Sequence, residues 1–89
     1  GLCIVMLGIN TASGELTSGP DIITRGLMYS NENQISKDAR KVVLETIKDL
    51  SLQENEFSII KDAVKRNLSN HFYKNTKRRP MILTFILES

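Results

Sequence analysis

The chain has 89 residues, which is enough for one compact domain with a modest hydrophobic core. Hydrophobic residues make up 40% of the chain and charged residues 25%, a balance that excludes a disordered tail. The net charge of +2 is too small for a protein that packs nucleic acid by charge alone, and no apolar run approaches the roughly 20 residues of a membrane span.

Two strands are predicted first. Residues 2–9 form a continuous apolar run with β-branched members, which predicts a strand buried on both faces. Turn residues follow, and Gly14 can adopt the positive φ that closes a hairpin. The return strand is expected from residue 15 to about 29, as one bent strand. Pro20 interrupts it, because proline removes a ladder donor and is tolerated only at an edge or a bulge.

Two amphipathic helices and a last strand come next. Residues 30–33 are of helix-capping types, and Asn55 is a plausible cap for the second helix. Apolar residues recur at three- and four-residue spacing in two sets, each typical of one helix: Ile35, Ala39, Val42, Val43, Ile47 and Leu50; then Phe57, Ile60, Val64, Leu68 and Phe72. Residues 74–79 are expected to form a basic linker, and residues 81–87 the last strand.

This order predicts an α+β fold: a small three-stranded sheet with two helices packed on one face (β-β-α-α-β). Two helices with one apolar stripe each can cover only one face of that sheet. The first and last strands are nevertheless apolar on both faces, and large exposed apolar patches usually mark an interface.

We therefore predict that the second face docks onto the rest of a longer parent protein or onto a second copy. The candidate docking residues are Leu2, Ile4, Met6, Met81, Leu83 and Phe85. Two alternatives stay open: the strands pair in another way, or the loop through Pro20 folds over that face.

The side chains offer no catalytic, cofactor-binding or metal-binding set. His71 is the one histidine, and even an open catalytic zinc site needs three protein ligands. Cys3 lies in the most apolar stretch, which indicates an inert buried thiol. A lone cysteine also favours a reducing, cytoplasmic setting. All five glycines lie at or before Gly26, so a phosphate-binding loop that opens a helix is missing.

Basic residues gather late in the chain. Residues 61–79 hold seven Lys and Arg against one acidic residue, Asp62. Such a cluster can attract RNA phosphates, or it can be an ordinary solvated helix face and linker. The candidate RNA contacts are Lys74, Lys77, Arg78 and Arg79. A nucleic-acid-binding module is thus the rival to a docking domain, and a free-standing enzyme is the third and least supported class.

Two segments carry a family resemblance. Residues 18–26 (SGPDIITRG) and 76–83 (TKRRPMIL) strongly resemble the C-terminal domain of ribonuclease J, a family of metallo-β-lactamase/β-CASP ribonucleases. Their order and their separation by a two-helix region match as well, so the resemblance covers nearly the whole chain. Leu27, Thr84, Phe85 and residues 31–33 depart from the family pattern, which indicates a divergent member.

The resemblance implies a parent protein that degrades and matures RNA as an endonuclease and a 5′-to-3′ exonuclease. Its zinc would lie in a catalytic domain absent from this chain, and no zinc ligand maps to any position here. Residues 1–89 would form a single C-terminal accessory domain, whose partners are the catalytic domains of its own chain and a second copy or a paralogue. The chain opens without Met and inside a predicted strand, which also suggests an excised domain.

Overall fold

The computed structural model describes residues 1–10, 12–26, 32–50 and 57–88, without the side chains of residues 32 and 33. Three strands and two helices follow one another in the predicted order β-β-α-α-β. Their bounds are β1 (Leu2–Asn10), β2 (Glu15–Arg25), α1 (Glu32–Asp49), α2 (Phe57–Thr76) and β3 (Met81–Glu88). The α+β fold class is thereby confirmed.

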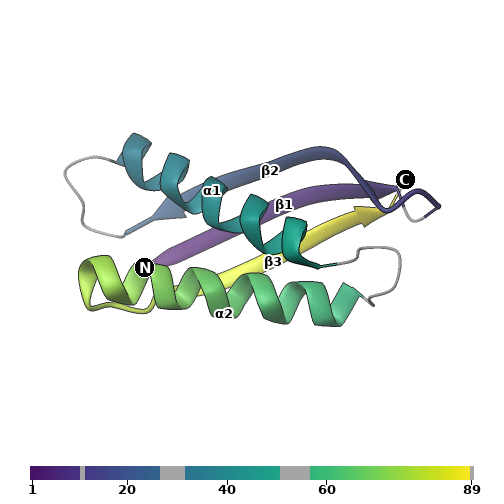
Figure 1. The fold of residues 1–89 in the computed structure, drawn as a ribbon. Helices are drawn as coiled ribbons and strands as arrows, with labels where there is room; N and C mark the ends of the chain where they lie inside the picture. Colours follow the sequence, from purple (N-terminus) through teal and green to yellow (C-terminus); the bar gives the residue numbers. More distant parts are fainter. Residues whose placement is uncertain (11, 27–31, 51–56, 89) are drawn as a thin grey trace.

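The three strands form one mixed sheet in the order β2-β1-β3 (Figure 1). β1 and β2 pair antiparallel as a hairpin, whereas β1 and β3 pair parallel. Parallel strands need a long crossover, and the chain makes it through both helices (Figure 1). At the hairpin, the Gly14 N–H donates to the Asn10 carbonyl over 2.7 Å, and Gly14 has the predicted positive φ of 74°.

Pro20 lies in β2, which is an edge strand and remains one strand across the proline, as predicted. The pairing of β1 with β2 shifts register between Met6 and Ile9, so the sheet is irregular opposite this segment. β2 ends at Arg25, and the following Gly26 has a positive φ of 66°. The remainder of the predicted strand, residues 27–29, lies outside the described residues.

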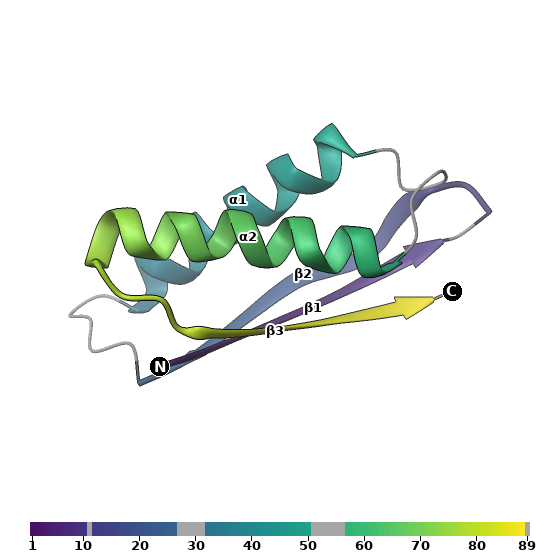
Figure 2. The same cartoon turned by 90° about the horizontal axis from the view of Figure 1, so that it is seen from below.

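Both helices pack on the same side of the sheet. Figure 2 shows α1 and α2 on one side of the three strands, with no described element on the other side of the sheet. The alternate residues of β1 that point toward the helices are fully buried. Most residues of the predicted helical stripes are buried as well, and Ile35, Val42, Leu50 and Phe57 are partly buried against the same core. This core comprises Cys3, Val5, Leu7, Ile9, Ala39, Val43, Ile47, Ile60, Val64, Leu68, Phe72 and Ile82. Each large apolar side chain buried there contributes on the order of 1.5–3 kcal/mol of transfer free energy.

One polar contact joins the two helices. The Asn67 amide donates to the Thr46 hydroxyl over 2.8 Å, and that hydroxyl donates to the Val42 carbonyl over 2.8 Å. Thr46 is buried, so this chain of hydrogen bonds satisfies a polar group that would otherwise destabilise the helix interface.

Among the described residues, neither helix combines the length and the apolar character that crossing a membrane would require.

The predicted linker over residues 74–79 is partly wrong, because α2 continues to Thr76. The Thr76 hydroxyl donates to the Phe72 carbonyl, and the Lys77 N–H donates to the Tyr73 carbonyl over 2.7 Å. Lys77 then takes a left-handed φ of 63°, which ends the helix. Lys74 is therefore a helical residue. The predicted capping side chains at residues 30–33 and Asn55 lie outside the described part of the chain.

Candidate interaction surfaces

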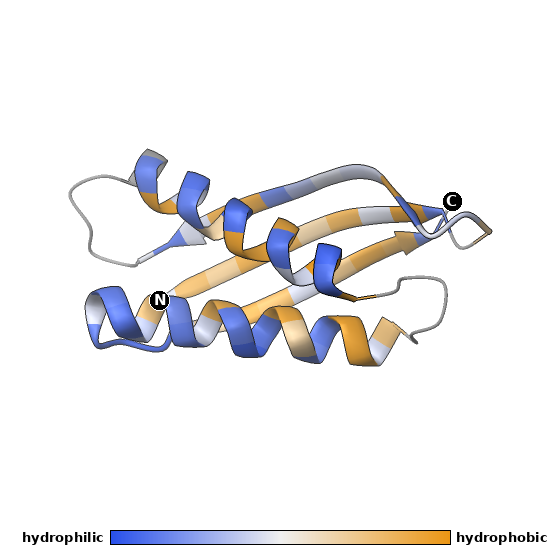
Figure 3. Cartoon of the chain, in the orientation of Figure 1, coloured by the Kyte–Doolittle hydropathy of each residue, from blue (hydrophilic) through white to orange (hydrophobic). Residues whose placement is uncertain are grey.

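The side of the sheet opposite the helices is apolar and open. We define the open sheet face as Leu2, Ile4, Met6, Ile23, Met81, Leu83, Phe85 and Leu87, which the pairing registers place side by side. Phe85 is 50% exposed, and Met81 and Leu87 are each 65% exposed. The hydropathy colouring of β1 and β3 is correspondingly mostly hydrophobic along both strands (Figure 3). The prediction that these strands are apolar on both faces is confirmed.

All six predicted docking residues lie on the open sheet face. The register also adds Ile23, which pairs with Ile4 across β1 and β2. The sequence could not assign Ile23 to a face, because the register shift near Pro20 breaks the alternation of side chains. On β2, Asp21 and Arg25 form a polar border to the apolar surface, since they pair with Met6 and Leu2.

Pro20 does not cover the open sheet face. It is buried, and it lines a cavity of about 200 Å³ with Ser36, Lys37 and Arg40 of α1. It therefore lies on the helix-covered side of the sheet. The alternative in which the loop through Pro20 folds over the second face is wrong, because this segment packs toward α1 instead.

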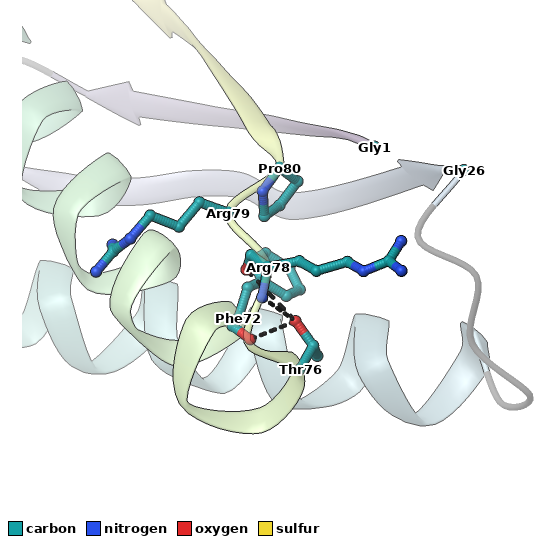
Figure 4. Close-up of a pocket in the computed structure, with 7 residues that line it drawn as sticks. All are labelled: Gly1, Gly26, Phe72, Thr76, Arg78, Arg79 and Pro80. Atoms are coloured by element: carbon teal, nitrogen blue, oxygen red, sulfur yellow. Dashed lines mark hydrogen bonds between the residues drawn. The ribbon is translucent and has the colours of Figure 1, made fainter.

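The four predicted RNA contacts do not form one cluster. Lys74 lines the groove between the helices, together with Glu45 and Asp49 of α1. Arg78 lines a cavity of about 180 Å³ together with Gly1, Gly26 and Pro80, and its side chain extends away from that of Arg79 (Figure 4). Lys77 and Arg79 meet at the ring of Tyr73. Arg79 also lines the cavity that Arg78 lines, whereas Lys74 lies apart from the other three.

A hydrogen-bonded turn fixes where the last two basic residues point. The Arg78 N–H donates to the Thr76 hydroxyl over 3.1 Å, and the same hydroxyl donates to Phe72 (Figure 4). Together with the left-handed Lys77, these bonds reverse the chain at the end of α2. The reversal carries Arg79 back along the helix.

Arg79 is held in place on the outside of α2. Its Nη1 donates to the Ser69 hydroxyl over 2.8 Å and contacts the Asn70 side-chain oxygen at 3.4 Å. Its guanidinium carbon lies 4.6 Å from the centroid of the Tyr73 ring, and the Lys77 ammonium lies 5.5 Å from the same centroid. These are cation–π distances. Ser69 and Asn70 were not predicted from the sequence, although their spacing to Tyr73 places all three on one helical face.

Neither His71 nor Cys3 is arranged for chemistry. The His71 ring packs edge-on against Phe72, with 5.8 Å between the ring centroids. Cys3 is fully buried, and this burial raises the pKa of its thiol from 9.0 to about 11, which keeps it protonated and unreactive. Among the residues that the structure describes, no group of three or more His, Cys, Asp and Glu could hold a metal ion. The zinc implied by the family resemblance thus finds no fitting residues in this part of the chain.

Comparison with known proteins agrees with this picture. The family model for the ribonuclease J C-terminal domain matches residues 1–89. Over 90 residues the chain is 34% identical to ribonuclease J2 of Bacillus subtilis (strain 168), covering 99% of this chain and 16% of that protein. It is 32% identical to ribonuclease J 2 of Staphylococcus saprophyticus over 90 residues and of Staphylococcus aureus (strain NCTC 8325 / PS 47) over 91 residues, with the same coverage. The chain thus spans about a sixth of the length of these relatives, and it belongs to the ribonuclease J C-terminal domain family.

Proposed function

We propose that this chain is a non-catalytic accessory domain of a longer ribonuclease J-like protein, and that it docks onto the catalytic part of that protein through the open sheet face. The parent would be a zinc-dependent cytoplasmic enzyme that cleaves RNA internally and degrades it from the 5′ end. The observation that supports docking is the row of exposed apolar side chains along β3: Met81, Leu83, Phe85 and Leu87.

The physical argument rests on the cost of leaving these side chains in water. Burial contributes roughly 25 cal/mol for each Å² of apolar surface removed from water. Phe85 is 50% exposed and Met81 is 65% exposed, so a partner that covers them would gain much of this free energy. Large side chains at the centre of an apolar patch are also typical interface anchors. Asp21 and Arg25 would provide a polar rim that orients the partner.

Oligomer assembly is part of the same proposal. Where the catalytic part does not cover the open sheet face, a second copy or a paralogue would occupy it instead. Because a twofold contact uses the same patch on both subunits, such an assembly would bury the open sheet face of each.

Exposure-matched variants test the docking proposal. Leu83 and Leu44 are both 39% exposed, and Phe85 at 50% is close to Ile59 at 47%, but Leu44 and Ile59 lie on the helices. We expect L83S/F85S to weaken binding to the separately expressed remainder of the parent, and L44S/I59S to leave it unchanged. Isothermal titration calorimetry measures this binding. Analytical ultracentrifugation of the same chains measures self-association.

The docking proposal fails if the strand and helix pairs weaken binding equally, or if neither weakens it. It also loses its oligomer part if the wild-type chain stays a monomer at high concentration both alone and when attached to the parent. Binding that survives L83S/F85S would place the interface elsewhere on the chain.

A second candidate function is direct contact with RNA. The concentration of positive charge at the end of α2 and after it favours this function, since each neutralised phosphate adds salt-dependent affinity. Replacing Lys74, Lys77, Arg78 and Arg79 with glutamine tests it. If the domain binds RNA, this change should weaken binding and flatten the salt dependence. Unchanged binding would mean that these residues serve the fold alone.

A further inference from the structure

Charge is divided unequally between the two halves of this small chain. Residues 57–79 hold seven of the twelve basic residues but only one of the ten acidic residues. This segment therefore carries a formal charge of +6, and the rest of the chain carries −4, which together give the net +2. The small net charge of the chain is the sum of a strongly basic segment and an acidic remainder. A polyanion would be attracted by the local charge of the basic segment, which the net charge does not reveal.

Helical spacing gathers part of this charge on one surface. Residues three and four apart on a helix are neighbours, so one line of side chains runs along α2 away from the sheet. We define the outer α2 face as Lys65, Arg66, Ser69, Asn70, Tyr73 and Lys77, together with Arg79 from the following turn. One shallow cavity of about 270 Å³ is lined by five of these residues and by Asp62: Lys65, Arg66, Ser69, Asn70 and Arg79.

Arg79 is preorganised on this surface. Ser69 and Asn70 hold Nη1, and the guanidinium carbon lies 4.6 Å from the centroid of the Tyr73 ring. Among the described residues its hydrogen bonds run from Nη1 alone, which leaves Nε and Nη2 to meet a ligand. A flexible arginine loses rotamer freedom when it binds, whereas this one has already lost it in the free chain. Its planar fork matches two oxygens of one phosphate.

The surface combines phosphate-binding groups with a stacking platform. Lys65, Arg66 and Arg79 provide three cations in one cavity, and Tyr73 beside them is 45% exposed. Aromatic rings and guanidinium planes are the groups on which unpaired bases stack in single-stranded RNA. A basic surface without an aromatic side chain would favour any polyanion, so Tyr73 is the feature that favours a nucleic acid.

We propose that the outer α2 face binds single-stranded RNA, with phosphates on Lys65, Arg66 and Arg79 and a base stacked beside Tyr73. The proposal rests on the second candidate function, RNA contact, but relocates it: Lys74 faces the groove toward α1, and Arg78 points to the opposite side of the turn. The outer α2 face is also on the far side of the molecule from the open sheet face. One domain can thus dock and bind RNA at the same time.

Fluorescence anisotropy with a short labelled single-stranded RNA of mixed sequence tests the proposal on the 89-residue chain. Three phosphate contacts predict that the logarithm of the association constant falls against the logarithm of salt with a slope of about −2. The variant K65Q/R66Q removes two contacts, so we expect about 10-fold weaker binding or more at low salt and a slope of about −0.7. The variant Y73L should weaken binding about 5-fold or more, and Y73F should preserve it.

A matched control separates the site from overall charge. The variant K41Q/K48Q removes two exposed cations from α1 and changes the net charge by the same amount. We expect it to bind RNA nearly as well as the wild type. All of these positions are exposed, so circular dichroism and a melting temperature near that of the wild type should show that every variant stays folded.

The outcomes distinguish the two proposals. If the wild-type chain does not bind RNA at low salt, RNA contact and its location on α2 both fail. If it binds RNA but K41Q/K48Q weakens binding as much as K65Q/R66Q does, RNA contact survives and the outer α2 face is wrong. If polyglutamate displaces the RNA as well as unlabelled RNA does, and Y73L has no effect, the surface recognises acidic protein rather than RNA.

Discussion

Two leucine-to-alanine changes, one on each face of the sheet, test the architecture directly. Leu7 of β1 is 1% exposed beneath the helices, and Leu83 of β3 is 39% exposed on the open sheet face. Both changes remove the same three carbon atoms, worth about 2.4 kcal/mol when fully buried. L7A loses all of this and leaves a cavity, so we expect a cost of about 3–5 kcal/mol.

The cost of L83A should be much smaller. About three-fifths of that side chain is buried against its neighbours, which gives about 1.5 kcal/mol, and no closed cavity remains because water reaches the open face. In a domain of this size each kcal/mol shifts the melting temperature by roughly 4–8 °C. Urea denaturation followed by circular dichroism would measure both free energies of unfolding.

Equal costs for the two variants would refute the one-sided cover. The measurement should be repeated at several protein concentrations, because self-association would bury Leu83 and raise its cost as concentration rises. A large cost for L83A at every concentration would mean that the open sheet face is packed within a single chain.

Two further predictions concern the backbone and the buried thiol. At Gly19, with φ of 75°, an added Cβ would lie 2.6 Å from the Met6 carbonyl oxygen. At Gly26, with φ of 66°, an added Cβ would lie 3.8 Å from the Cα of Gly1 and meet no closer atom among the described residues. Thermal unfolding should therefore show a loss of more than about 2 kcal/mol for G19A and about 1 kcal/mol for G26A, and equal losses would contradict the close approach. Burial raises the pKa of Cys3 from 9.0 to about 11, so the folded chain holds this proton more tightly than the unfolded chain. Its contribution to stability is complete below pH 9 and is lost as pH rises through about 11, and C3A should fall less steeply across that window in pH-dependent urea denaturation.

Local patterns were sufficient for the elements and for the two-faced apolar character of the sheet. The apolar run at residues 2–9 and the two helical stripes predicted β1, α1 and α2 because burial imposes its period on the sequence. The C-terminal end of α2 was predicted too early. Lys74, Asn75 and Thr76 are polar and resemble a linker, yet backbone hydrogen bonds carry the helix through them without any apolar stripe.

The sequence predicted one candidate site better than the other. Alternation along β1 and β3 assigned Leu2, Ile4 and Met6 to one face with Met81, Leu83 and Phe85, since side chains in strands repeat every two residues. Closeness in the sequence did not show how the basic side chains are oriented. These residues are close along the chain, but Lys74 lines the groove toward α1. Beyond the left-handed Lys77, the side chains of Arg78 and Arg79 extend in opposite directions.

The sequence alone showed which residues of each strand and helix are apolar and need burial. It also showed that the sheet has more apolar surface than two helices can cover. These patterns did not predict the parallel pairing of β3 with β1 or the return of Arg79 onto Ser69 and Tyr73. The physical reason is range. Hydrophobic periodicity is local to one element, whereas strand order and the path of a turn depend on contacts between residues far apart in the chain.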